Sequence, residues 1–239
     1  MKTLLLALSV AAAQAADVHF LCSNGMRSVV EQVQPAWEKA TGNKLIVEYS
    51  SANSLKEKMA SGVAFDVTIL SGEVAAAAAQ SKLIGAPTPI AKGGIGVGVR
   101  KGAAKPDLKA ADGLKKFLLA AKSIVFTENG ASRPTIDKMF DKMGIAAALK
   151  PRIQLVGPGI ASELVAEGKA EVVLTLMSEI LPIAGVELVG PLPAEYQGYV
   201  SFSGALSAKP TQAKAGQAFL DHLATPAVTV IIKAKGLER

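Results

Sequence analysis

The sequence predicts an α/β fold with largely parallel sheets, divided between two lobes. β-branched apolar segments alternate with segments rich in Ala, Lys and Glu, as strands and helices alternate in α/β proteins. Several helical segments end at a glycine, including Gly42, Gly62 and Gly144, where a left-handed residue costs little. At 239 residues two lobes are more natural than one, and the breaks fall near Pro87-Thr88-Pro89 and Gly190-Pro191-Leu192-Pro193.

The first 15 residues are expected to form a secretory signal peptide. Lys2 precedes the apolar run Leu4–Val10, and Ala13-Gln14-Ala15 matches a small-x-small cleavage site. A buried helix is the alternative for this segment. Later stretches fall short of the roughly twenty apolar residues that a membrane span requires, so we expect an exported, periplasmic protein.

Strand and helix patterns then alternate to the end of the chain. We predict strands over Val18–Cys22, Lys44–Tyr49, Val67–Leu70, Gly94–Arg100, Ser123–Phe126, Ile153–Leu155, Val172–Leu176, Val186–Gly190 and Tyr199–Ala205. We predict helices over Arg27–Thr41, Asn53–Ser61, Gly72–Gln80, Lys109–Ala121, Pro134–Met143, Gly159–Gly168 and Gln212–Ala224.

The two breaks divide the mature chain into a first lobe, residues 16–90 plus 194–239, and a second lobe, residues 91–193. The chain then crosses between the lobes twice. Gly93–Gly98 has no dinucleotide-loop spacing, because no helix follows it directly, and it is better explained as a strand through the hinge. Such crossings leave a cleft bordered by strand-end loops, where α/β proteins bind ligands and about which lobes can close.

Three polar loops, each between a predicted strand and a predicted helix, are the candidate binding elements. They are Ser23–Arg27, Ser50–Ser54 and Asn129–Arg133. A helix start presents unpaired N–H groups and partial positive charge, which suits a small anion. Arg27 and Arg133, at equivalent places in the two lobes, could each add a bidentate clamp on a carboxylate.

The candidate ligand-binding residues share these loops or a neighbouring strand end. They are Ser23, Asn24, Arg27, Ser51, Asn53, Ser132, Arg133 and Ser178. Alternatives stay open, because Ser and Asn are favoured helix N-caps in any protein. Arg133 could equally pair with Asp137, one helical turn on. Ser71, Gly72 and Glu179 also follow strands and are ranked lower.

Composition argues against several other functions. The net charge of +6, or +5 without Lys2, is spread along the chain and aromatics are only 5%, so nucleic-acid binding is not expected. His19 and His222 have no neighbouring ligand at metal-site spacing, so neither a metal nor another cofactor is expected. Cys22 is the single cysteine, and a lone cysteine at a strand end is more often a small buried hydrophobe than a reactive thiol.

The chain resembles the periplasmic molybdate-binding proteins of ABC importers, which are two-lobed type II solute-binding proteins. The resemblance is carried by Ser23-Asn24, by Tyr49–Leu55 leading to Phe65-Asp66-Val67, and by Gly159–Val165 followed by Glu171–Leu174. It implies the type II periplasmic-binding-protein fold with two hinge crossings, capture of a small anionic solute by a monomer, and an ABC permease as partner.

Family members that bind molybdate are expected to use a serine hydroxyl in each of the first two loops. Here Asn24 stands at the first position and Ala52 at the second, between Ser51 and Asn53. These departures, with arginines beside two loops, favour an organic polycarboxylate over molybdate.

An enzymatic function is the alternative, because aconitate isomerase is similar to the same family. Such an enzyme needs a base for allylic proton transfer. Glu128 and Cys22 are the candidate bases, with Glu179, Tyr196 and Tyr199 as further possibilities near strand ends. None of them lies in a catalytic motif.

Overall fold

The computed structural model describes residues 15–108 and 111–239. The predicted signal peptide lies outside the described residues except for Ala15, as do the first two residues of the predicted helix Lys109–Ala121. The strands are β1 (Asp17–Ser23), β2 (Lys44–Ser50), β3 (Val67–Ser71), β4 (Thr88–Arg100), β5 (Ile124–Thr127), β6 (Ile153–Val156), β7 (Val172–Leu176), β8 (Val186–Pro191), β9 (Tyr199–Leu206) and β10 (Leu237–Glu238). The helices are η1 (Asn24–Met26), α1 (Arg27–Thr41), α2 (Ala52–Ala60), α3 (Gly72–Gln80), α4 (Ala111–Ala120), α5 (Arg133–Met143), α6 (Ala146–Leu149), η2 (Lys150–Arg152), α7 (Ala161–Ala166), α8 (Met177–Ile180), α9 (Ala213–Leu223) and α10 (Pro226–Ala234).

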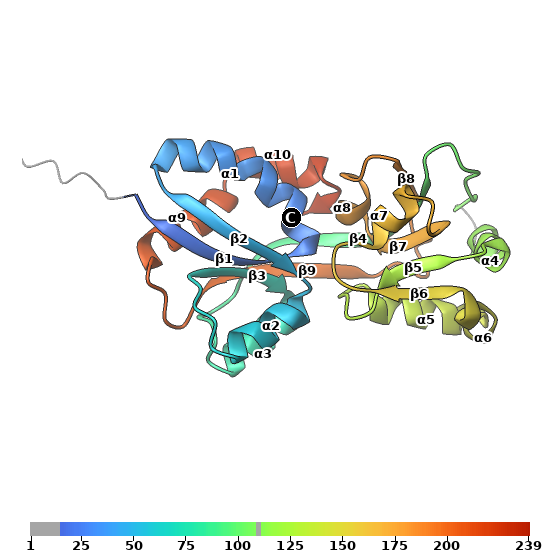
Figure 1. Ribbon diagram of the computed structural model, residues 1–239, viewed down its shortest axis with the longest axis horizontal. Coiled ribbons are helices and arrows are strands. Elements are labelled where there is room, and N and C mark those ends of the chain that lie inside the picture. The colour runs from blue at the N-terminus through green and yellow to red at the C-terminus, as the bar shows by residue number, and fades with distance from the viewer. Residues whose placement is uncertain (1–14, 109–110) are drawn as a thin grey trace, which may run out of the picture.

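The strands follow the order β2-β1-β3-β9-β4-β7-β5-β6, with β8 and β10 also paired to β4. We call lobe I the half built on β2, β1, β3 and β9, and lobe II the half built on β7, β5 and β6 (Figure 1). In each lobe the consecutive strands β1, β2 and β3, or β5, β6 and β7, pair in parallel. The predicted α/β, two-lobed architecture is confirmed.

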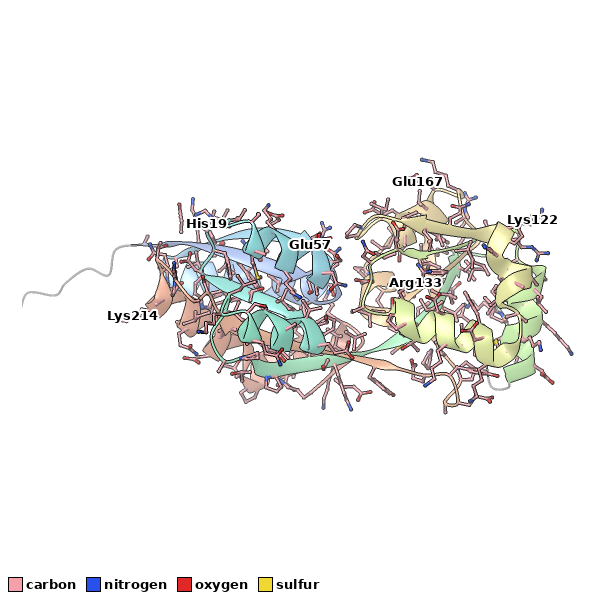
Figure 2. The ribbon with its side chains drawn as sticks, turned by 90° about the horizontal axis from the view of Figure 1, so that it is seen from below. His19, Glu57, Lys122, Arg133, Glu167 and Lys214 are labelled. Carbon is pink, nitrogen blue, oxygen red and sulfur yellow. The ribbon has the colours of Figure 1, made fainter. Side chains whose placement is uncertain are left out.

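Strand β4 joins the two lobes. Its first half, Thr88–Gly94, pairs with β9, and its second half, Ile95–Arg100, pairs with β7 and β8. The glycine-rich segment is therefore a strand through the hinge, as predicted, although it begins six residues earlier than Gly94. Figure 1 and Figure 2 show β4 and β9 running side by side between the lobes.

Apolar residues at helical spacing explain how α1 packs on lobe I. Val29, Val30, Val33 and Trp37 are buried along one face, and a helix with such a stripe gains most of its stability from packing. The helix ends at Gly42, whose φ of 74° is the left-handed cap that the sequence predicts.

Each lobe has its own apolar core. In lobe I, Phe219 of α9 meets Phe20 of β1 and Trp37 of α1 edge to face at 5.3 and 5.2 Å. In lobe II, Phe126 of β5 and Phe140 of α5 lie 6.1 Å apart. Separate cores allow the lobes to move as bodies about β4 and β9. The predicted lobe limits at residues 90/91 and 193/194 stay predictions.

Several elements differ from the sequence-based expectation. The predicted helix Gly159–Gly168 is shorter, Ala161–Ala166, because Gly159 has a φ of +84° and Gly168 of +75°, both outside helical backbone geometry. The short α6, α8 and α10 were not predicted. None of the described helices is long and apolar enough to cross a membrane.

Candidate ligand-binding site between the lobes

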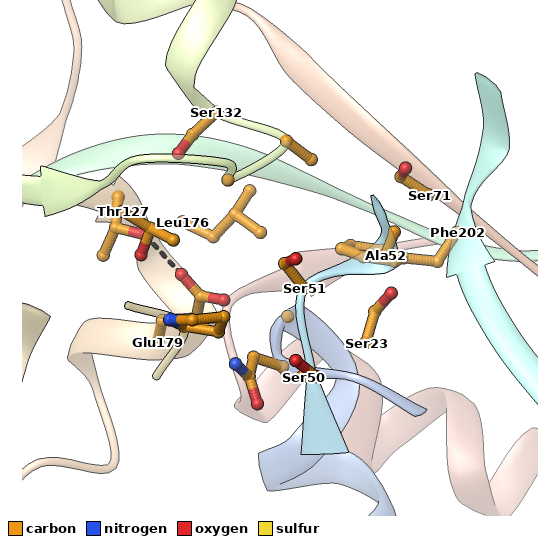
Figure 3. Close-up of a pocket in the computed structure, with 16 residues that line it drawn as sticks. Ser23, Ser50, Ser51, Ala52, Ser71, Thr127, Ser132, Leu176, Glu179 and Phe202 are labelled. Carbon is orange, nitrogen blue, oxygen red and sulfur yellow. Dashed lines mark hydrogen bonds between the residues drawn. The ribbon is translucent and has the colours of Figure 1, made fainter. Parts of the chain in front are cut away.

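A cavity lies between the lobes and is lined by both of them (Figure 3). We call it the central pocket. Lobe I contributes the ends of β1, β2 and β3 with the residues that follow, and Phe202 of β9. Lobe II contributes the ends of β5 and β7 and the loop before α5. The lining residues are Ser23, Asn24, Gly25, Ser50, Ser51, Ala52, Ser71, Thr127, Gly130, Ala131, Ser132, Pro158, Thr175, Leu176, Glu179 and Phe202.

Parallel strand order explains why the serines of lobe I converge. Ser23 lies opposite Ser50 in the β1–β2 register, and Ser71 ends β3 on the other side of β1. Parallel strands present their carboxyl ends at one edge, so these side chains meet although they are far apart in sequence. The loop before α5 brings Ser132 of lobe II to the same pocket.

The serine hydroxyl groups of the pocket differ in their hydrogen bonds to the protein. Ser51 caps α2, because its Oγ accepts from the Ser54 backbone N–H at 3.2 Å. Ser71 and Ser132 precede α3 and α5 but make no side-chain cap bond. Ser23 is only 3% exposed, and its Oγ has no hydrogen-bond partner among the described residues. Such a group costs about 1–3 kcal/mol unless a bound molecule satisfies it.

Glu179, the third residue of α8, places its carboxyl in the central pocket (Figure 3). Thr175 Oγ1 donates a hydrogen bond to Glu179 Oε2. Burial raises the pKa of Glu179 above its usual value, and the bond from Thr175 only partly opposes this. Of the 16 described lining residues, Glu179 alone is a carboxylic acid or a base. The pocket is therefore a hydroxyl-rich, otherwise uncharged cavity with one partly buried acid.

Arg27 lines a second cavity that shares Asn24 and Glu179 with the central pocket. We call it the adjoining pocket. Its other lining residues are Ser28, Glu31, Gly159, Glu163, Ser178, Pro182 and Ile183. Arg27 Nε donates to Glu31 Oε1 at 2.7 Å, and its guanidinium lies 5.2 Å from the centre of the Tyr49 ring. A cation therefore stands beside the central pocket rather than in it.

Arg133 does not line either pocket. It is the first residue of α5, as Arg27 is of α1, so the predicted equivalence of position is present. Its Nε contacts both Asp137 carboxylate oxygens, at 2.6 and 2.8 Å, and its guanidinium lies over Phe126 (Figure 2 shows it within lobe II). The alternative interpretation, pairing with Asp137, describes this geometry.

The remaining predicted ligand-binding residues divide between pocket and surface. Ser23, Asn24, Ser51 and Ser132 line the central pocket. Asn53 is exposed on α2 and lines neither pocket, because the helix turns it away from the strand ends.

Ser178 lies in the adjoining pocket and joins the lobes. Its Oγ donates to the Gly25 carbonyl at 2.8 Å, and its own carbonyl accepts from Ser28 Oγ at 3.4 Å. These bonds connect α8 of lobe II with η1 and α1 of lobe I.

Neither predicted base lines the central pocket. Glu128 is exposed, and Cys22 is buried in the core of lobe I with Sγ 3.5 Å from the Ser23 carbonyl. Burial raises the pKa of the Cys22 thiol well above its ordinary value, which keeps it protonated. Tyr199 is 57% exposed, and Tyr196 lines a separate cavity beside α5. Among the five considered, Glu179 is the acid–base group that reaches the pocket.

Thr127, Thr175 and Phe202 line the pocket without having been predicted. Thr175 lies in a predicted strand and Thr127 directly follows one, and only the parallel pairing of β5 with β7 brings both to the same cavity. Their position next to predicted strand ends was the one available signal.

The two lobes, the two crossings and the pocket between them define a periplasmic-binding-protein fold. The chain belongs to the bacterial extracellular solute-binding protein family, whose model matches residues 18–238. Among solved structures, the periplasmic molybdate-binding protein of Azotobacter vinelandii is 18% identical, with a TM-score of 0.79 over 93% of this chain and 99% of that one.

Two further relatives cover most of the chain. PEB3, a Campylobacter jejuni protein solved with L-phospholactate bound, is 19% identical with a TM-score of 0.70, over 93% of this chain and 100% of the other. Among curated proteins, an aconitate isomerase from a Pseudomonas species is 26% identical over 225 residues, 91% of this chain and 86% of that protein. The predicted family resemblance is confirmed.

Proposed function

We propose that this chain is an exported binding protein that closes its two lobes on a small organic polycarboxylate and delivers it to an ABC importer. The observation that carries the proposal is the buried, unpartnered hydroxyl of Ser23, which faces a cavity lined from both lobes. A hydroxyl in that state donates well to an anionic oxygen, and charged acceptors form the stronger hydrogen bonds.

The adjoining pocket favours a ligand with more than one carboxylate. One anionic group would lie among the hydroxyls of Ser23, Ser71 and Ser132, and a second would reach toward Arg27 past Asn24. Arg27 is then a clamp at one end of the ligand rather than half of a pair across the cleft. A relative that holds L-phospholactate, which carries two anionic groups, is consistent with this arrangement.

Calorimetric titration of the purified protein tests the proposal. The probes are cis-aconitate, trans-aconitate, citrate and tricarballylate, against molybdate and tungstate. We expect a polycarboxylate to bind more tightly than either oxyanion. Ser23→Ala should weaken that binding about tenfold or more, the value of one charge-assisted hydrogen bond. Ser81→Ala, at an exposed serine after α3, is the matched control. Tighter binding of molybdate would contradict the polycarboxylate assignment.

Isomerisation is the second candidate, and Glu179 is the observation that favours it. A carboxyl of raised pKa in a ligand pocket is suited to removing an allylic proton from one carbon and returning it to another. The 26% identical relative is named aconitate isomerase. Aconitate is a tricarboxylate, so the substrate of this chain would also be a tricarboxylate.

Proton NMR of cis-aconitate with the protein in D2O distinguishes an enzyme from a carrier. An enzyme would produce the trans isomer with deuterium incorporated, and Glu179→Gln would abolish this turnover. Glu128→Gln, at an exposed acid outside the pocket, is the control. A thermal shift with no change in the ligand spectrum would support the carrier alone.

A further inference from the structure

Glu179 occupies the junction between the two pockets. It lines both of them, together with Asn24. Its Oε2 accepts the hydrogen bond from Thr175, which leaves Oε1 as the oxygen available to a ligand. Any anion that fills the central pocket and extends toward Arg27 must pass this carboxyl.

An ionised Glu179 would oppose such a ligand. Two negative charges a few ångströms apart repel each other, and the repulsion is stronger where burial lowers the local dielectric constant. The neutral acid instead offers an O–H donor and removes the repulsion. The pocket therefore suits an anion if Glu179 is protonated, and a cation or a hydroxyl-bearing neutral solute if Glu179 is ionised.

The charged groups around Glu179 do not offset the repulsion between an ionised Glu179 and an anion. Arg27 and Glu31 of α1 are paired with each other, and Glu163 of α7 adds a further negative charge in the adjoining pocket. Strands β7 and β5 and helix η1 present uncharged side chains to the central pocket. Strands β4 and β8 also pack on α8, and their charged side chains Lys92, Arg100 and Glu187 line neither pocket.

We infer that Glu179 binds the anionic ligand as a neutral carboxylic acid, donating from Oε1 to the ligand, so that capture of the anion is coupled to uptake of one proton. The proton comes from solvent and stays on Glu179, and no covalent bond of the ligand changes. The inference rests on the proposed function. It makes Glu179 a specificity-determining residue that favours anions and links their release to rising pH.

The test measures affinity for cis-aconitate as a function of pH, where the probe's own carboxyls are fully ionised. Above the pKa of Glu179 the affinity of the unmodified protein should fall by about tenfold per pH unit, the slope for one proton. Titrations in buffers of different ionisation enthalpy should show uptake rising toward one proton per ligand. Glu179→Gln, which keeps a donor, should flatten the pH profile. Glu179→Ala should also flatten it, and should weaken binding at the low-pH end, where the donor of the protonated acid is lost.

Glu128→Gln should retain the pH profile of the unmodified protein, because Glu128 is exposed and outside both pockets. Parallel pH profiles for the unmodified protein and Glu179→Gln, or affinity that rises with pH, would overturn the inference while leaving anion binding intact. Absence of binding by every carboxylate and oxyanion probe at every pH would instead overturn the proposed function.

Discussion

Two carboxyl groups inside this protein have pKa values that are shifted in opposite directions. Asp66, directly before β3, is 1% exposed and accepts four hydrogen bonds. Three come from the backbone N–H groups of His19, Thr211 and Gln212 at 2.9, 2.7 and 2.8 Å, and one comes from Thr211 Oγ1 at 2.9 Å. Glu179, in the central pocket, accepts one from Thr175.

The number of donors decides the charge of each group. Burial tends to raise the pKa of Asp66, but its hydrogen bonds outweigh burial and lower the pKa, so it stays ionised. Burial raises the pKa of Glu179, and a single donor does not reverse it. Asp66, with four hydrogen-bond donors, holds β1, β3 and the start of α9 together. Glu179, with one donor and a place in a cavity, is a candidate for interaction with a ligand.

Replacing Asp66 is expected to have the largest effect. Asp66→Ala leaves buried backbone donors without an acceptor, and should lower the free energy of unfolding by about 3 kcal/mol or more. Urea unfolding followed by circular dichroism measures this. A loss below about 1 kcal/mol would show that the hydrogen bonds to Asp66 do not hold this part of the fold together.

The acid dependence of stability follows from the same group. Because its pKa is lower in the folded protein, Asp66 stabilises the fold fully above the unfolded value of about 3.9. That contribution is lost as pH falls from there through the folded pKa. The free energy of unfolding of Asp66→Asn should therefore change less with pH over this acid range than that of the unmodified protein.

Gly25→Ala should have the next largest effect, at the lobe junction beside the pocket. A Cβ on Gly25 would lie 2.4 Å from Phe202 Cζ and 2.7 Å from Leu176 Cδ1, so the hinge side chains must shift. We expect a loss of about 1–3 kcal/mol in stability together with weaker ligand binding. Gly157→Ala, where a Cβ meets nothing within 4 Å, is the control. Similar losses in both variants would argue against a tightly packed junction.

Ser23→Ala should affect the ligand-free protein little, in contrast with Asp66→Ala. Removing an unpartnered buried hydroxyl is expected to leave the free energy of unfolding unchanged or to raise it by up to about 1 kcal/mol. Thermal and urea unfolding without ligand measure it. A clear destabilisation would mean that Ser23 has a structural role.

Glu31→Gln should give the smallest change in stability. The Arg27–Glu31 pair is about half exposed, and such pairs contribute less than about 0.5 kcal/mol. Freed from its partner, Arg27 should bind a polycarboxylate more tightly in calorimetry. Asp137→Asn, which breaks the corresponding Arg133 pair outside the pockets, should leave that affinity unaltered.

Local patterns predicted much of this molecule because strands, helices and their caps depend on nearby residues. The helix Arg27–Thr41 is found with the predicted bounds, since an apolar stripe and Gly42 define it. The helix α8 was missed because its four residues follow β7 without a cap or a periodic pattern. Glu179 was therefore known only as a residue near a strand end.

Local sequence patterns were enough to predict the α/β class, the two lobes, the hinge strand and four polar residues that line the pocket, Ser23, Asn24, Ser51 and Ser132. The folded chain was needed to show that Arg27 lies beside the central pocket, that Arg133 pairs with Asp137, and that Glu179 lines the cavity. Strand ends converge by topology, which local sequence encodes, whereas the direction of a long charged side chain depends on partners that folding brings within reach.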